Sequence, residues 1–201
     1  MQFNIIRVFR DSAESISQEI HQIDSELGNT RLMPSLACQK MLILAEDKRA
    51  WKHCGVDFVA ILRSIVLTVL GKPHGGSTIL QQLVRTLTGR YERTFARKYS
   101  EILLSYMVAA KVDRSIYPRV YLSIAYYGTG IENYDKLIDQ IRNSPEDELQ
   151  FAAMAVARLK YPEPRQKSPL MQTLILRREK FLIRKYRMSK DTRIFSHVKA
   201  V

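Results

Sequence analysis

The sequence predicts an all-α protein in one domain, on three observations. Apolar residues recur at helical spacing, residues suited to helix caps precede several of these segments, and no run alternates apolar and polar residues as a strand does. With 201 residues the chain is long enough to bury a core within one domain.

Three helices are predicted in the first third of the chain. Residues 12–27 show a polar amphipathic pattern, and Ser35 precedes a second helix that we expect to end near Glu46. Asp57 is a suitable N-cap for an apolar helix over residues 58–70.

The middle of the chain predicts three further helical segments. Ser77 is expected to cap a helix that ends near Gly89, and Thr94 to open a long helix that continues to about Val112. Residues 115–127 form another apolar segment, which the sequence Gly-Thr-Gly terminates.

Two Ser-Pro pairs predict the starts of the last two helices, because serine caps a helix and proline fits its first turn. Ser144 and Pro145 would place Asp147 at the third helical position, as in a capping box, and Ser168 and Pro169 would begin the final helix.

From these elements we expect a helical N-terminal extension over residues 1–33, a main domain over residues 34–190 and a basic C-terminal tail over residues 191–201. The chain has 32 Lys and Arg against 20 acids, for a net charge of +12, and residues 158–201 hold thirteen of the bases and three of the acids. Such a field suits nucleic acid, anionic lipid or a phosphorylated substrate. Because no aromatic-interleaved motif accompanies the charge, we expect no nucleic-acid partner.

Export and membrane signals are weak in the sequence. Cys38 and Cys54 are too few for a disulfide framework and lack a second pair for a zinc site. We find neither the apolar core of a signal peptide nor a segment as long as a spanning helix. The longest apolar run, residues 58–70, is interrupted by Arg63, so if the protein meets a membrane, we expect it to lie on the membrane or dip into it.

The first candidate for chemistry is a pair of adjacent carboxylates, Glu46 and Asp47, with His53 seven residues after Glu46. These ionisable groups would lie where a helix becomes a loop, and catalytic groups concentrate on loops that rigid helices hold in place. On these residues alone an alternative stays open, in which both acids are solvated charges paired with Lys48 or Arg49.

The second candidate is the sequence Gly-Gly-Ser-Thr-Ile-Leu-Gln-Gln, residues 75–82. Glycines let a backbone approach a ligand closely, and Ser77 or Thr78 at a helix start would leave N–H groups and hydroxyls for an anion. Gln81 and Gln82 follow within a turn and can hydrogen-bond a polar ligand. The alternative is an ordinary loop and cap with both glutamines in solvent.

The third candidate is a basic cluster that comprises Arg85, Arg93, Arg97 and Lys98. Glu101 follows four residues after Arg97, on the same helix face. Guanidinium groups hold phosphate oxygens with paired donors, so the cluster suits a pyrophosphate. The alternative is an exposed helix with a surface Arg97–Glu101 pair.

Together and in this order, the three motifs resemble those of the family 51 glycosyltransferases, the peptidoglycan glycosyltransferases found alone or fused to penicillin-binding proteins. Residues 46–57 resemble the family's first motif, with Ala50 in place of its phenylalanine. Residues 75–82 match the motif G-G-S-T-I-x-Q-Q without a mismatch, and residues 97–101 match R-K-x-x-E. The resemblance covers about residues 41–187.

The resemblance implies a lysozyme-like helical lobe beside a smaller, membrane-facing jaw, for which residues 58–70 are the candidate. It implies inverting transfer that polymerises lipid II, in which Glu46 takes the proton of the acceptor 4-hydroxyl and a pyrophosphate leaves. Glu101 matches the family's second essential glutamate and is expected to organise the cations. Arg85 stands where the family usually has lysine. The expected substrate-binding residues are Asp47, His53, Ser77, Thr78, Gln81, Gln82, Arg85, Arg93, Arg97 and Lys98.

The expected partners are lipid II, the growing lipid-linked glycan, an anionic membrane surface and cell-wall assembly proteins. The resemblance implies a peripheral position on the outer, periplasmic face of the bacterial cytoplasmic membrane. A divalent cation, Mg or Mn, is one candidate cofactor, which Glu101 is a candidate to organise, although its full set of ligands is unknown. No organic cofactor is expected. A diverged relative that binds lipid-pyrophosphate without turnover and a lysozyme-like hydrolase are the alternatives.

Overall fold

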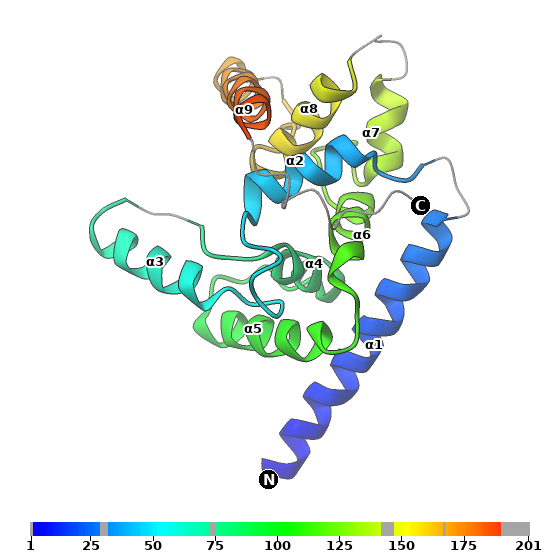
Figure 1. Ribbon diagram of the computed structural model, residues 1–201, viewed down its shortest axis with the longest axis vertical. Coiled ribbons are helices and arrows are strands. Elements are labelled where there is room, and N and C mark those ends of the chain that lie inside the picture. The colour runs from blue at the N-terminus through cyan, green and yellow to red at the C-terminus, as the bar shows by residue number, and fades with distance from the viewer. Residues whose placement is uncertain (1, 29–31, 73–74, 142–146, 167, 190–201) are drawn as a thin grey trace.

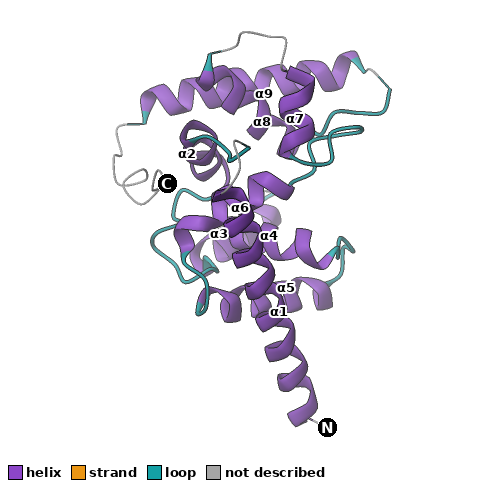
Figure 2. Cartoon of the chain, turned by 90° about the vertical axis from the view of Figure 1, so that its right-hand side faces the viewer, coloured by secondary structure: helices purple, strands orange, loops and turns teal. Residues whose placement is uncertain are grey.

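The computed structural model describes residues 2–28, 32–72, 75–141, 147–166 and 168–189, which fold almost entirely into helices (Figure 1). The elements are α1 (Gln2–Gly28), α2 (Leu36–Glu46), α3 (Phe58–Val69), α4 (Ile79–Thr88), α5 (Phe95–Ala109), the 3₁₀ turn η1 (Arg114–Ile116), α6 (Tyr117–Ile124), α7 (Tyr134–Ile141), α8 (Glu148–Lys160) and α9 (Pro169–Met188). These described residues contain no β-strand (Figure 2), so the all-α prediction is confirmed.

Helix α6 lies at the centre of the fold and packs against α1, α2, α4 and α7. On one side α8 packs between α2 and α9, and on the other α5 packs against α1 and α4. One apolar core joins both groups, with fully buried Ile20, Leu42, Leu83, Leu122 and Leu182 contributed by five different helices. This arrangement is consistent with the lysozyme-like lobe that the resemblance implies, and it packs both α2 and α4 against α6.

Four of the predicted helix caps are confirmed. The side chains of Ser35, Asp57, Thr94 and Ser168 each accept a backbone N–H from the first turn of the helix that follows. These contacts span only three residues, so local sequence is sufficient to predict them.

Helix α1 is longer than predicted, because it begins at Gln2 rather than near residue 12. Ala13, Ile16 and Ile20 are buried in the same core as the rest of the protein. The first turns project away from the body, with Ile5 exposed (Figure 1). The predicted extension therefore shares its second half with the main core.

Helix α3 projects sideways from the body (Figure 1) and exposes most of its apolar side chains. Ala60 is its buried residue, whereas Phe58, Leu62 and Val69 are exposed, Val69 by 82%. Helix α3 is thus an apolar helix that faces outward and is not covered by the rest of the described chain. Across the described ranges, no helix combines the length and apolar content needed to cross a bilayer.

Some predicted boundaries are wrong. Helix α5 ends at Ala109 rather than near Val112, and the segment predicted over residues 115–127 divides into η1 and α6. The division follows from Pro118, which lacks an N–H and fits only the first turn of a helix.

The last third of the chain also departs from the prediction. Asp147 is the N-cap of α8 rather than its third helical residue, and α7 was not predicted. Ser144 and Pro145 lie outside the described residues, as does the predicted basic tail over residues 191–201.

Candidate active site

Glu46 is the last residue of α2, and its carboxylate faces α4 and α9. Oε1 lies 3.1 Å from Nη2 of Arg178, and Oε2 lies 3.5 Å from Nε2 of Gln82. The side chain is still 24% exposed. A carboxylate that keeps access to solvent can take a proton from a hydroxyl that comes within hydrogen-bond distance.

Asp47 follows Glu46 directly but points into the protein. Its Oδ2 accepts the backbone N–H of Ile79 at 3.2 Å, and Oδ1 lies 3.0 Å from Nε2 of His53. Both side chains are more than nine-tenths buried. Asp47 therefore connects the end of α2 to the start of α4 and holds the His53 ring, while the predicted substrate contacts of these two residues stay predictions.

Thr78, and not Ser77, caps α4. The Thr78 hydroxyl oxygen accepts the N–H of Gln81 at 3.2 Å, and Gln81 Oε1 accepts the N–H of Thr78 at 3.0 Å, which completes a capping box. The same hydroxyl donates to the carbonyl of Gly55 at 2.6 Å. The predicted Ser77 cap is wrong, because the Ser77 hydroxyl instead accepts a hydrogen bond from Lys98 at 2.9 Å.

Three of the N–H groups at the start of α4 are consequently engaged by the protein. Gln81 accepts that of Thr78, Asp47 accepts that of Ile79, and Thr78 accepts that of Gln81. The prediction that this helix start offers free N–H groups to an anion is wrong for these three groups.

Gly76 allows the loop before α4 to pack closely against α3. A Cβ added at this position would lie 2.8 Å from the Ser64 hydroxyl and 2.9 Å from the carbonyl of Ala60, closer than real Cβ atoms approach. Glycine therefore allows the loop before α4 to run directly along the projecting helix.

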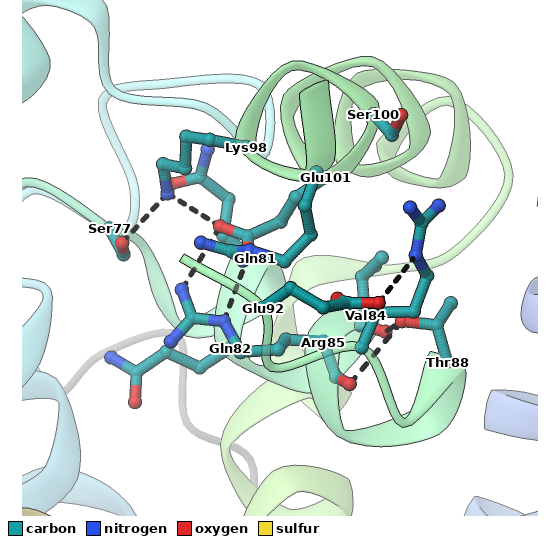
Figure 3. A network of polar contacts seen from close by, with 12 residues as sticks. Ser77, Gln81, Gln82, Val84, Arg85, Thr88, Glu92, Lys98, Ser100 and Glu101 are labelled. Atoms are coloured by element: carbon teal, nitrogen blue, oxygen red, sulfur yellow. Dashed lines mark hydrogen bonds and ion pairs between the residues drawn. The ribbon is translucent and has the colours of Figure 1, made fainter. Parts of the chain in front are cut away.

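Glu101 of α5 gathers a cluster of cations (Figure 3). Arg85 reaches it from α4, with Nε 2.8 Å from Oε2 and Nη2 3.2 Å from Oε1. Lys98 Nζ lies 2.5 Å from Oε1 and also donates to Ser77, and Arg97 contacts Oε2. The carboxylate is 3% exposed, so the alternative of an exposed surface pair is wrong.

The environment of this cluster shifts the pKa values of Glu101 and Lys98. Burial by itself would raise the pKa of Glu101, but hydrogen bonds from Arg85 and Lys98 outweigh it and hold the pKa below its ordinary value of 4.5. Burial lowers the pKa of Lys98, and its contact with Glu101 offsets part of that effect. One anion faces three cations, so the cluster carries net positive charge.

A divalent cation does not fit this carboxylate. Both oxygens of Glu101 already accept hydrogen bonds from Arg85, Arg97 and Lys98. Nor does any group of three or more His, Cys, Asp or Glu side chains in the described ranges form a metal-ligand set. The candidate Mg or Mn stays a prediction, and we derive no step through it.

Helix α4 links the two glutamates. Gln82 and Arg85 lie three residues apart, so they share one face of the helix. Gln82 reaches Glu46, and Arg85 reaches Glu101. Gln81 points inward to the capping box, and Arg93 is exposed between α4 and α5 and is not among the residues that contact Glu101. The predicted substrate contacts of both stay predictions.

Three residues near Glu46 were missed in the sequence. Arg178 and Lys185 come from α9, more than 130 residues later in the chain, and Tyr121 comes from α6. Lys185 donates to the carbonyl of Leu44 at 2.5 Å, and burial, with nearby cations, lowers its pKa to about 8. The basic character of the last helix was the only signal for the two cations, and it did not indicate where they point.

Comparison with known proteins gives a consistent identification. A family model described as Transglycosylase matches residues 13–187. Penicillin-binding protein 4 of Bacillus subtilis is 29% identical over 119 residues, which cover 58% of this chain and 19% of that protein. Penicillin-binding protein 1B of Haemophilus influenzae is 38% identical over 89 residues, 43% of this chain and 11% of that protein.

Penicillin-binding protein 1A of Aquifex aeolicus is 37% identical over 90 residues, 44% of this chain and 12% of the relative. The matched region thus spans less than a fifth of the length of each of these three relatives. The family match covers most of the chain and contains both glutamates and the helix that links them. The chain belongs to the transglycosylase family, the family 51 glycosyltransferases.

Proposed function

We propose that the chain polymerises lipid II into glycan strands by inverting transfer, with Glu46 as the general base. Glu46 takes the proton of the acceptor 4-hydroxyl, and the oxygen attacks the anomeric carbon of the lipid-linked donor. The bond from that carbon to the pyrophosphate breaks, and the lipid pyrophosphate leaves. The proposal rests on family membership together with the geometry around α4.

The observation that carries this proposal is the contrast between the two ends of one helix face. Gln82 places α4 against a carboxylate that is open to solvent, and Arg85 places it against a buried, positively charged cluster. An inverting transfer needs both, because a base must act on the acceptor while cations stabilise the charge that develops on the leaving group. Ser77, Arg97 and Lys98 are the proposed partners of the pyrophosphate.

The proposal includes a peripheral position on the outer face of the cytoplasmic membrane. Helix α3 offers exposed apolar side chains that would enter the acyl region of a bilayer. Helix α9 exposes Arg177, Lys180, Arg184 and Arg187, spaced along one helix face, which would favour anionic head groups. Cell-wall assembly proteins remain proposed partners for which no surface is assigned.

A lipid II polymerisation assay tests the activity. We expect polymer from the wild-type protein with detergent and divalent metal supplied, and none from Glu46→Gln. Absence of polymer from the wild type would overturn the proposed function. Tight lipid II binding without product would then identify a diverged binding relative, and release of reducing ends from purified cell wall would identify a hydrolase.

Co-sedimentation with vesicles tests the membrane contact. We expect Leu62→Ser with Val69→Ser to weaken binding to vesicles by about tenfold, since each substitution removes apolar area that would enter the bilayer. Tyr126→Ser, which alters a half-exposed ring on the connection after α6, is the matched control and should bind as the wild type does. Equal binding by all variants would contradict the role of α3.

A further inference from the structure

Gln82 stands between Glu46 and a buried tyrosine. Its Nε2 lies 3.5 Å from Oε2 of Glu46, and its Oε1 lies 2.9 Å from the hydroxyl of Tyr121. Tyr121 belongs to α6, which packs against both α2 and α4. One amide therefore joins the carboxylate at the end of α2 to the central helix of the fold.

The chemistry of the three groups determines the direction of both hydrogen bonds. An ionised carboxylate only accepts, so the NH₂ group of Gln82 must face Glu46. The amide oxygen then faces Tyr121, whose hydroxyl must donate. Burial raises the pKa of Tyr121 and the charge of Glu46 raises it further, so the hydroxyl keeps its proton.

We propose that Tyr121 is a positioning residue for the general base, and that it acts through Gln82. The inference rests on the proposed function of Glu46. With the tyrosine hydroxyl present, the amide is fixed at both ends, its oxygen by Tyr121 and its NH₂ by Glu46. Without the hydroxyl, the amide oxygen loses this donor, so the side chain is held less firmly against Glu46, while the contact of Glu46 with Arg178 is unchanged.

Steady-state kinetics with Tyr121→Phe test the inference, with Tyr117→Phe as the matched control. Tyr117 lies one turn earlier on α6, is equally buried, and donates to the carbonyl of Val112 at 2.9 Å. We expect Tyr121→Phe to lower kcat about tenfold with KM unchanged within about twofold. Tyr117→Phe should leave kcat and KM near the wild-type values. We expect both variants to lower the unfolding midpoint by similar amounts, since each removes one buried hydroxyl.

A double-mutant cycle separates positioning from a general structural effect. In a Gln82→Met background the amide is absent, so Tyr121→Phe should lower kcat no further. Equal losses in Tyr121→Phe and Tyr117→Phe, or an undiminished effect of Tyr121→Phe in the Gln82→Met background, would overturn the inference.

A spectroscopic measurement keeps the inference testable without turnover. The Gln82 side-chain NH₂ signals in a ¹⁵N-correlation spectrum, assigned through Gln82→Met, should shift in Tyr121→Phe and stay in place in Tyr117→Phe. Unmoved signals in Tyr121→Phe would overturn the inference even if the wild type polymerises lipid II. A wild type without polymerase activity would instead overturn the proposed function, and these signals would still report whether Tyr121 orients the amide.

Discussion

The two glutamates of the site occupy opposite environments. Glu46 lies at the end of a helix, is 24% exposed and, among the described residues, accepts hydrogen bonds from Arg178 and from the neutral amide of Gln82, the latter at 3.5 Å. Glu101 is 3% exposed and receives hydrogen bonds from Arg85, Arg97 and Lys98. The same side chain is thus available for proton transfer at one position and committed to gathering cations at the other.

The difference shows that environment, and not residue type, assigns the chemistry. A buried carboxylate surrounded by three cations is held in its ionised form, so it cannot serve as a proton carrier near neutral pH. A carboxylate that keeps solvent access can change its protonation state as the reaction proceeds. We therefore propose that turnover depends on Glu46 and that the architecture of the cation cluster depends on Glu101.

The largest expected effect is on turnover. Glu46→Gln should lower the polymerisation rate by about 10³-fold, because a neutral amide cannot accept the acceptor proton. Lipid II binding should change by less than about twofold, since the cation cluster is intact. Initial rates and a direct binding measurement check this, with Glu132→Gln at an exposed position as control. Substantial polymerisation by Glu46→Gln would contradict the assignment of the base.

The second effect is on stability, and here the substitution at Glu101 is expected to have a larger effect than the one at Glu46. Glu101→Gln should lower the free energy of unfolding by about 3 kcal/mol, because it leaves three partly buried cations without their anion. Glu46→Gln should change it by less than about 1 kcal/mol, as expected for a partly exposed pair. Urea unfolding of both variants measures the difference. Equal destabilisation would remove the distinction between the two sites.

The third effect is a pH dependence that belongs to Glu101. Its pKa in the folded protein lies below the ordinary value of 4.5, so the stability it contributes is present above pH 4.5 and is lost as pH falls through the folded value. Wild-type stability should therefore fall more steeply than that of Glu101→Gln below about pH 5. Urea unfolding as a function of pH measures both slopes, and parallel slopes would contradict the assignment.

The smallest effect concerns the geometry of one cation. Arg85 contacts both oxygens of Glu101 through two nitrogens, and a lysine can supply only one such position. Arg85→Lys should cost about 1 kcal/mol of stability. Arg90→Lys, at a half-exposed arginine 3.9 Å from Glu92, is the matched control and should be nearly neutral. An equal cost at both positions would show that the paired geometry is unimportant.

The helix starts show which caps can be predicted from neighbouring residues in the sequence and which cannot. Ser35 and Asp57 were predicted as caps and are caps, because the contact lies within the next three residues. At α4 two hydroxyl residues are adjacent, and the choice of Thr78 over Ser77 depends on distant groups. Thr78 donates to Gly55, whereas Ser77 accepts from Lys98 of α5.

The exposure of the apolar helix could not be predicted from the sequence either. Residues 58–70 have the composition of a buried helix, and composition does not tell whether another helix covers them. The structure places α3 away from the core, with Ala60 as its buried residue. Only the packing of the other helices decides that this apolar surface faces outward.

By itself, the sequence determined the all-α class, four of the helix starts and the grouping of Arg97, Lys98 and Glu101, because these follow from contacts within a few residues along the chain. The tertiary structure alone decided which glutamate is buried, and it brought Tyr121 and Arg178 to the neighbourhood of Glu46. The physical reason is that burial and long-range hydrogen bonds depend on how the helices pack. Residues 132 positions apart, such as Glu46 and Arg178, leave no mark of their contact in the local pattern.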